Sequence, residues 1–303
     1  MAIIEGKRAF LYKLLPLDLY LKIIYRKYHH KRLNLKNPKL FSEKLFWLKK
    51  YNMNTQKDLI MKCYDKYLVR DYVKHKIGSE YLTELYGVFD DVAEIEFDNL
   101  PDKYVMKITQ SCRFNIIHNE ASCYTNSDIC EAMKNWKKQQ EDMKIIEKNL
   151  REESFYFDGN PRIICEECLQ DKDGNIPNDV RFFCFNGIPQ FFCIDYDTID
   201  ESGNKKHDFF YRNVYSIDGT FIPVEIGRPN NPKIQMPHIK NFSKMVEISK
   251  KLSEDFLFVR VDLYNVDGRI IFGELTWMPQ GGNMPINPKE YDYKFGTYLN
   301  LPL

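Results

Sequence analysis

The sequence has no apolar run long enough to cross a bilayer, and it has almost no net charge. Its longest apolar runs fall far short of the roughly 20 residues that a membrane-spanning helix needs. No apolar h-region with a small-residue cleavage site follows the N-terminus. The 303 residues carry a formal charge of +1, so no global positive field selects nucleic acid. We therefore expect neither an integral nor a secreted protein, and no nucleic-acid partner.

Glycine, proline and cysteine are also sparse. With 14 Gly, 14 Pro, 29% charged and 44% hydrophobic residues, the composition argues against disorder and favours a folded globular protein. The eight cysteines lack the dense spacing of a disulfide scaffold, so we expect free thiols in a reducing cytoplasm. Cys165 and Cys168 form a Cys-x-x-Cys pair, but no second pair follows, and we expect no zinc site.

Residues 7–32 are strongly basic. Eight Lys and Arg residues stand against one acid, Asp18, and they are interleaved with Leu, Ile and aromatic residues. Such a segment could lie on an anionic membrane surface as a peripheral contact. An ordinary docking helix with a solvated basic face gives the same pattern, and the imperfect periodicity favours this second interpretation.

The change of hydrophobic period along the chain predicts three regions of an α+β protein. Residues 1–80 are expected to be helical, with helices at 42–50, capped by Ser42, and at 56–76, closed by Gly78. Residues 81–160 form a small α+β lobe, with strands at 82–89, 104–108 and 115–117 and a helix at 127–150. Residues 161–303 form a mainly antiparallel sheet, with strands at 162–168, 180–185, 188–194, 209–215, 256–265 and 269–277 and a helix at 240–252.

Two hairpins are expected in this last region. Asn186-Gly187 lies between two aromatic strands, and both residues tolerate the positive φ of a two-residue turn. A second hairpin turns at residues 266–268. If its loop has three residues with Gly268 in the αL conformation, Arg260 faces Glu274 across the ladder.

The second hairpin carries a charged face. Side chains alternate along a strand, so Arg260 and Asp262 point away from the apolar face of Val259, Val261 and Leu263. In the expected register Asp262 and Glu274 are diagonal neighbours about 7 Å apart, close enough to share a magnesium ion beside phosphate groups. Arg260 would meet the same phosphates. The alternative is a surface Arg-Glu pair of little energetic value.

A second group of candidates surrounds the strand at 104–108. Lys107 interrupts this apolar strand and needs an anion if it is buried, which phosphate would supply. An edge-strand lysine that reaches water is the alternative. The side chains that follow, Ser111 and Arg113 among them, could extend a phosphate cradle. The acids Glu166 and Glu167 end another apolar strand; they could contact a nucleoside or simply face solvent.

Together, these segments resemble the TupA-like (teichuronopeptide-biosynthesis-like) family of the ATP-grasp superfamily, found with capsule and exopolysaccharide machinery. The resemblance covers about residues 37–292. Its carriers are the segments 37–49, 65–73, 105–108, 163–169, 180–187, 258–265 and 273–276. It implies an ATP-grasp fold, in which two α+β lobes enclose a nucleotide cleft behind a helical N-terminal extension.

The resemblance also implies roles for individual residues. ATP phosphates are expected on Lys107, on the lid segment 109–115, which includes Ser111, Arg113 and Asn115, and on Arg181, where the family usually has lysine. Glu166 and Glu167 are expected at the adenine hinge, and Asp262 and Glu274 as Mg²⁺ ligands. The hairpin geometry, and not the resemblance, makes Arg260 the expected catalytic group. The lid segment departs from the family because it contains no glycine.

The activity implied is a carboxylate-amine ligase that uses ATP and Mg²⁺ in polysaccharide biosynthesis. Its substrates would be a carboxylate-bearing sugar or amino acid and an amine. Two alternatives remain open from the sequence. One is a kinase that phosphorylates a polysaccharide precursor, and the other is a non-catalytic scaffold in an assembly complex, which the glycine-free lid and the basic N-terminal segment would suit.

Overall fold

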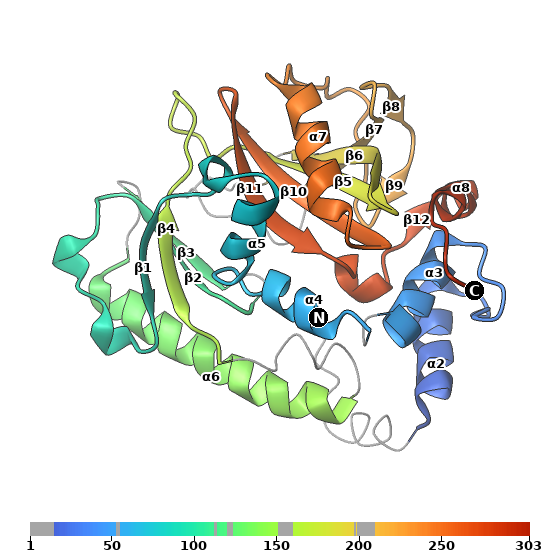
Figure 1. The fold of residues 1–303 in the computed structure, drawn as a ribbon, viewed down its shortest axis with the longest axis horizontal. Coiled ribbons are helices and arrows are strands. Elements are labelled where there is room, and N and C mark those ends of the chain that lie inside the picture. Colours follow the sequence, from blue (N-terminus) through green and yellow to red (C-terminus); the bar gives the residue numbers. More distant parts are fainter. Residues whose placement is uncertain are drawn as a thin grey trace. The chain divides into compact units, whose positions relative to one another are not determined.

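A computed structural model describes residues 15–52, 55–111, 114–119, 124–150, 160–196, 198 and 210–303, without the side chains of 141–150. The chain divides into two compact units, each assembled from separated segments (Figure 1). Unit 1 comprises Met1–Leu33, Met53–Leu68 and Leu85–Glu167, and unit 2 comprises Asn34–Asn52, Val69–Glu84 and Cys168–Leu303. The boundaries predicted near residues 80 and 160 stay a prediction.

Unit 1 contains a four-stranded antiparallel sheet with one long helix. The strands are β1 (Leu85–Phe89), β2 (Tyr104–Ile108), β3 (Asn115–His118) and β4 (Ile163–Glu167), in the order β1-β4-β2-β3. Helix α6 (Asn126–Leu150) runs beside the sheet (Figure 1). Its Ile129 and Met133 join Met106, Ile108 and Cys165 in one buried cluster, so the helix covers one face of the sheet. Helices α2 (Leu17–His29) and α4 (Lys57–Tyr64) also belong to this unit.

Unit 2 is built on a six-stranded antiparallel sheet in the order β11-β10-β5-β6-β7-β8. These strands are β5 (Asp179–Phe185), β6 (Ile188–Tyr196), β7 (Tyr211–Ser216), β8 (Phe221–Ile222), β10 (Phe258–Val266) and β11 (Arg269–Thr276). A two-stranded ladder joins β9 (Glu225–Ile226) to β12 (Ile286–Asn287). The helices of this unit are α3 (Phe41–Trp47), α5 (Val69–Lys76), α7 (Phe242–Ser253) and α8 (Glu290–Tyr298).

Aromatic residues on successive strand positions cover both faces of this sheet. Phe182 and Phe192 pack against Phe242 of α7 on one face. On the other face Phe191 stacks on Phe295 of α8, with ring centroids 4.3 Å apart, and Phe185 contacts Phe41 of α3. Because strand side chains alternate, the segment Phe182–Phe185 places aromatic rings on both faces of the sheet. The second face is apolar around Phe185 and Phe191.

Both predicted hairpins are present, but one register differs from the expectation. Asn186 (φ 47°) and Gly187 (φ 77°) form the predicted two-residue turn. The second turn also has two residues, Asp267 (φ 54°) and Gly268 (φ 104°), so the three-residue loop is wrong and Val266 pairs with Arg269. Aspartate tolerates the αL region, which lets a type I′-like turn form without a third loop residue.

The β10–β11 ladder contains an irregularity that changes the site. Leu263 pairs with Phe272 while Asp262 pairs with Glu274, so Gly273 is the extra residue of a bulge. Asp262 and Glu274 are therefore directly opposite each other, not diagonal, and Arg260 pairs with Thr276. A Cβ at Gly273 would lie 3.0 Å from the Asp262 carbonyl oxygen, which accounts for glycine at the bulge.

Two helix predictions need correction. The expected helix at 56–76 is two helices, α4 and α5, separated at Asp65, whose carboxylate accepts hydrogen bonds from the Tyr67 and Leu68 amides. Ser42 does not cap α3, because Leu40 precedes the helix and the Ser42 hydroxyl donates to Asp292 of α8. No helix in the described part of the chain is long and apolar enough to cross a membrane.

The buried thiols give a prediction about reactivity. Burial raises the pKa of Cys165 and Cys184 from 9.0 to about 12 and that of Cys193 to about 11. At neutral pH the thiolate population therefore falls by roughly two to three orders of magnitude. We expect iodoacetamide to label these three cysteines slowly in the native protein and fully after denaturation, as mapped by peptide mass spectrometry. Partly exposed Cys130 and Cys168 are the internal controls. Equal labelling of all five in the native protein would contradict this packing.

Candidate functional site

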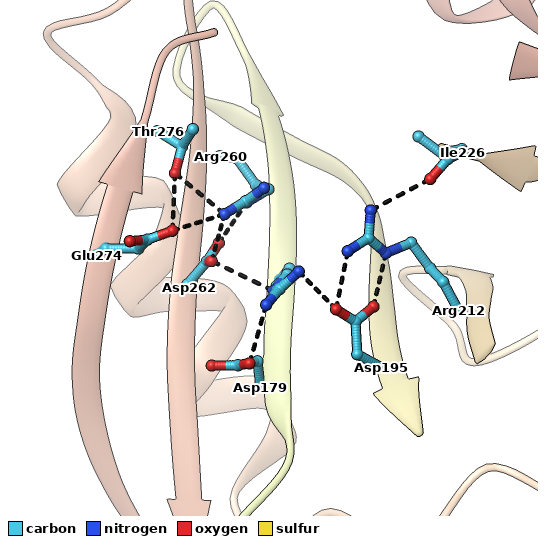
Figure 2. Close-up of polar contacts among 9 residues, drawn as sticks. Asp179, Asp195, Arg212, Ile226, Arg260, Asp262, Glu274 and Thr276 are labelled. Atoms are coloured by element: carbon cyan, nitrogen blue, oxygen red, sulfur yellow. Dashed lines mark hydrogen bonds and ion pairs between the residues drawn. The ribbon is translucent and has the colours of Figure 1, made fainter. Parts of the chain in front are cut away.

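Charged residues gather on one face of the unit 2 sheet, across five neighbouring strands (Figure 2). Strand pairing produces the group: Asp262 lies opposite Arg181 on one side and Glu274 on the other, and Asp195 lies opposite Arg212. All of them occupy strand positions on the face that carries Phe185 and Phe191 further along. We call the group the charge cluster: Asp179, Arg181, Asp195, Arg212, Arg260, Asp262, Glu274 and Thr276.

Arg260 is the most highly connected member at the β10–β11 end. Its Nε and Nη2 each lie 2.6 Å from an oxygen of Asp262, a bidentate pair. The same Nη2 lies 2.8 Å from Glu274 Oε1 and 3.0 Å from Thr276 Oγ1. One guanidinium nitrogen thus gathers oxygens from three residues. The side chains of Arg260 and Asp262 are 10% and 3% exposed, whereas that of Glu274 is 52% exposed. The Arg260–Glu274 pair therefore joins a buried guanidinium to a half-exposed carboxylate, and its role in binding a ligand stays a prediction.

Arg181 connects this group to the inner strands. Its Nη1 lies 2.6 Å from Asp195 Oδ2, its Nη2 lies 2.9 Å from Asp179 Oδ2, and its Nε lies 3.3 Å from Asp262 Oδ2. The Nε contact is an ion pair without hydrogen-bond geometry. Three aspartates therefore surround the guanidinium, and the expected contact of Arg181 with phosphate stays a prediction.

Arg212 fixes Asp195 from the other side. Its Nε and Nη2 lie 2.6 and 2.8 Å from the two Asp195 oxygens, and its Nη1 donates to the Ile226 carbonyl at 3.1 Å. Asp195 is fully buried and bridges two arginines. Its carboxylate therefore holds Arg181 in position from β6.

The two central carboxylates have opposite pKa shifts. Burial alone would raise the pKa of Asp195, but attraction by Arg181 and Arg212 outweighs it, and the pKa lies below the ordinary value. Burial raises the pKa of Asp262 to about 6, against the attraction of Arg260 and Arg181, and Glu274 adds to the rise. The rise at Asp262 therefore comes mainly from burial, despite its contacts with two guanidiniums.

The cluster suits a magnesium ion only in part. Asp262 Oδ2 and Glu274 Oε1 converge on the same Arg260 nitrogen, so two carboxylates point to one place. Among the described residues, no three His, Cys, Asp or Glu side chains form a group that could hold a metal. Two carboxylates suffice for magnesium at a nucleotide, because phosphates and water complete its octahedron. The donor set fits Mg²⁺ with ATP better than Mg²⁺ alone.

Lys107 and Glu166 form a separate pair in unit 1. Lys107 Nζ lies 3.0 Å from Glu166 Oε2, with side-chain exposures of 29% and 8%. β2 lies between β4 and β3, so Lys107 is not on an edge strand, and that alternative is wrong. The anion that Lys107 needs is supplied within the fold. Glu166 is buried and Glu167 half-buried, which excludes a fully exposed strand end.

The segment that follows β2 is held by side chains from the α4–α5 connection. Lys66 Nζ donates to the carbonyls of Ile108 and Ser111, and Gln110 Nε2 lies 3.1 Å from Asp65 Oδ2. The Ser111 hydroxyl donates back to the Ile108 carbonyl at 2.9 Å. These contacts close a turn at residues 108–111 without glycine.

The remaining lid candidates stand as follows. Asn115 lies opposite Lys107 on β3, while Arg113 lies outside the described residues. The phosphate roles of Ser111, Arg113 and Asn115 stay predictions, as does the hinge role of Glu166 and Glu167.

Sequence reasoning missed Asp179, Asp195 and Arg212. A signal was present, because Asp195 follows the apolar run Phe191–Ile194, where an acid is as costly as Lys107 is in its own strand. Its partners come from β5 and β7, and only the strand pairing reveals them.

Comparison with known proteins identifies relatives of the chain. A family model described as TupA-like ATPgrasp matches residues 43–300. No curated protein matches the chain.

Solved structures give distant matches. D-alanine–D-alanine ligase from Bacillus anthracis has 12% identity and a TM-score of 0.40, with 77% of this chain and 66% of that one covered. The Helicobacter pylori enzyme has 13% identity and a TM-score of 0.41, with 79% and 59% covered. The ADP complex of purK, N5-carboxyaminoimidazole ribonucleotide synthetase, has 15% identity and a TM-score of 0.37, with 86% and 57% covered. The chain thus spans less than two thirds of the length of these proteins.

Removing the charge of Asp195 tests the connection between Arg181 and Arg212. Asp195→Asn removes the carboxylate that pairs with buried Arg212 and one of the three around Arg181, so we expect a loss of about 3 kcal/mol or more in unfolding free energy by urea denaturation. Because the pKa of Asp195 is lowered, its contribution is complete above the unfolded value of about 3.9 and is lost as the pH falls through the folded value. Exposed Asp173→Asn is the control and should change stability by less than about 0.5 kcal/mol. Equal effects of the two variants would refute the bridging role.

Proposed function

Because the chain belongs to the TupA-like ATP-grasp family, we propose that it is an ATP-dependent carboxylate-amine ligase. It would use ATP and Mg²⁺ to activate a carboxylate and join it to an amine. The observation that carries this proposal is the convergence of Asp262, Glu274 and Thr276 on Arg260. These residues combine metal-binding oxygens with a fixed cation, and phosphoryl transfer requires both.

The proposal assigns each charged group a task. Asp262 and Glu274 would hold Mg²⁺, which when bound neutralises phosphate charge. Glu274 can turn toward a ligand because half of its side chain is exposed, whereas Asp262 is fixed by its bidentate contact with Arg260. Arg260 would leave Glu274 for the transferring phosphoryl group and remain paired with Asp262. Asp195 and Arg212 would keep Arg181 in place.

The proposed reaction has two balanced steps. A substrate carboxylate oxygen attacks the γ-phosphorus of ATP, and ADP leaves with the bridging electron pair. The amine then attacks the acyl carbon of the resulting acylphosphate, and inorganic phosphate leaves as the amine loses a proton. The product is an amide. Arg260 would stabilise the charge on the equatorial phosphoryl oxygens in the first step.

We propose the substrate class by resemblance to the family. We place the reaction in capsule or exopolysaccharide biosynthesis, with a hexuronic acid or glutamate as the carboxylate and an amino acid as the amine. A kinase would use the same ATP and Mg²⁺ groups but would leave a stable phosphate ester. A scaffold would turn over no ATP.

Trapping with hydroxylamine distinguishes these functions. With Mg-ATP and hexuronic acids or glutamate, we expect the parent protein to form a hydroxamate, because hydroxylamine captures an acylphosphate and not a phosphorylated hydroxyl. Asp262→Asn and Glu274→Gln should each abolish hydroxamate formation and reduce the thermal stabilisation that Mg-ATP gives. Glu290→Gln, which removes an exposed carboxylate in α8, is the matched control and should leave both unchanged.

Each contrary result has its own meaning. Release of ADP without formation of a hydroxamate would indicate a kinase instead of a ligase. If calorimetry detects no binding of Mg-ATP, the non-catalytic scaffold is the remaining function. Normal turnover by both carboxylate variants would remove Asp262 and Glu274 from the mechanism.

Lys107 offers a test in unit 1. If this lysine leaves Glu166 for phosphate when ATP binds, Lys107→Ala should weaken ATP about tenfold or more, the value of a charge-assisted hydrogen bond. The loss should persist in a Glu166→Gln background, because the phosphate contact does not need the glutamate. A lowered melting temperature with unchanged ATP affinity in both backgrounds would make the pair structural.

A further inference from the structure

Helix α2 has a buried face and an exposed face of unusual composition. Tyr20, Leu21, Ile24 and Tyr25 are buried. On the opposite side Leu19 and Ile23, one turn apart, are 45% and 37% exposed. Each exposed aliphatic residue alone is ordinary, but two adjacent ones on the solvent face of one helix form a small apolar ridge.

Basic residues surround this ridge. Lys22 and Arg26 lie on one flank and Lys27 on the other, by the 3.6-residue period, and all three are exposed. Within the part of the chain that the structure describes, no ion pair joins any of them to an acid. Asp18 is the sole acid in α2, at its first turn, and the solvent face of the helix is therefore cationic as well as apolar.

The described part of helix α6 provides a comparison within the same unit. It also exposes two lysines one turn apart, Lys134 and Lys138. They are mixed with exposed acids, Asp128 and Glu131, and no large hydrophobic side chain is exposed among residues 126–140. The scarcity of acids together with exposed aliphatic residues distinguishes α2 from the described part of α6.

We propose that the solvent face of α2 binds an anionic lipid surface. Leu19 and Ile23 would enter the boundary between headgroups and acyl chains, while Lys22, Arg26 and Lys27 would meet lipid phosphates beside them. The positive charges of Lys22, Arg26 and Lys27 complement lipid phosphates. Two aliphatic side chains also offer far less area than the roughly 800 Å² per partner that a stable protein interface buries, which favours lipid over protein. The inference is independent of the proposed ATP chemistry.

Co-sedimentation of the full chain with vesicles tests the charge requirement. We expect binding to vesicles of equal parts phosphatidylglycerol and phosphatidylcholine at low salt, and none to phosphatidylcholine alone. Each basic residue near such a surface contributes about fivefold to the binding constant. Lys22→Glu with Arg26→Glu should therefore weaken binding by more than about 25-fold. Lys134→Glu with Lys138→Glu reverses the same number of charges at the same spacing on α6 and should bind like the parent.

Fluorescence tests insertion of the apolar ridge. Ile23→Trp should show a blue-shifted emission on addition of the anionic vesicles, in difference spectra against the parent protein. Leu19→Ser with Ile23→Ser should abolish most binding at salt concentrations of about 0.15 M, where the Debye length of about 8 Å weakens the electrostatic part. Circular dichroism checks that the variants keep their helix content.

Three results would overturn the proposal. The first is absence of binding to anionic vesicles at low salt. The second is equal loss of binding in the α2 and α6 charge variants. The third is a concentration-dependent dimer that Leu19→Ser with Ile23→Ser disrupts, without vesicle binding, which would assign the face to a second copy of the chain.

Discussion

The bidentate ion pair between Arg260 and Asp262 connects the two halves of the charge cluster. Asp262 Oδ2 lies 2.6 Å from Arg260 Nη2 and 3.3 Å from Arg181 Nε, so one carboxylate oxygen touches both guanidiniums. From Arg260 the contacts extend to Glu274 and Thr276, and from Arg181 through Asp195 to Arg212. β10 makes this geometry, because it pairs with β5 on one side and β11 on the other.

Burying so many charges is costly unless each is compensated. The cluster contains four carboxylates and three guanidiniums, so it carries a net charge of −1 when all are ionised. A network of this kind adds little stability compared with apolar packing, but loss of one member exposes the full desolvation cost of its partners. At the β10–β11 end two carboxylates, Asp262 and Glu274, share Arg260, and Glu274 is half exposed. That end is the part of the cluster where an additional cation is electrostatically favourable.

In unit 1, the turn that follows β2 is also held by charged side chains. A glycine-rich loop lets a ligand approach the backbone closely, yet residues 109–111 here are Thr, Gln and Ser. The Lys66 ammonium instead binds the carbonyls of Ile108 and Ser111, and Asp65 binds the Gln110 amide. The turn is therefore ordered by side chains of the α4–α5 connection. Lys107, at the adjacent position on β2, pairs with Glu166.

The sequence by itself determined the α+β class, the strands at 104–108 and 180–185 and the Asn186-Gly187 turn, because these follow from local period and turn chemistry. It also singled out Arg260, Asp262 and Glu274, since charges that interrupt apolar strands are visible without a fold. Tertiary structure decided the rest. The bulge at Gly273 placed Asp262 opposite Glu274, and pairing of β5, β6 and β7 brought Asp195 to Arg181 and Arg212. A one-residue shift in a ladder changes every cross-strand neighbour. The pairing of strands that are far apart in the sequence cannot be deduced from any single segment.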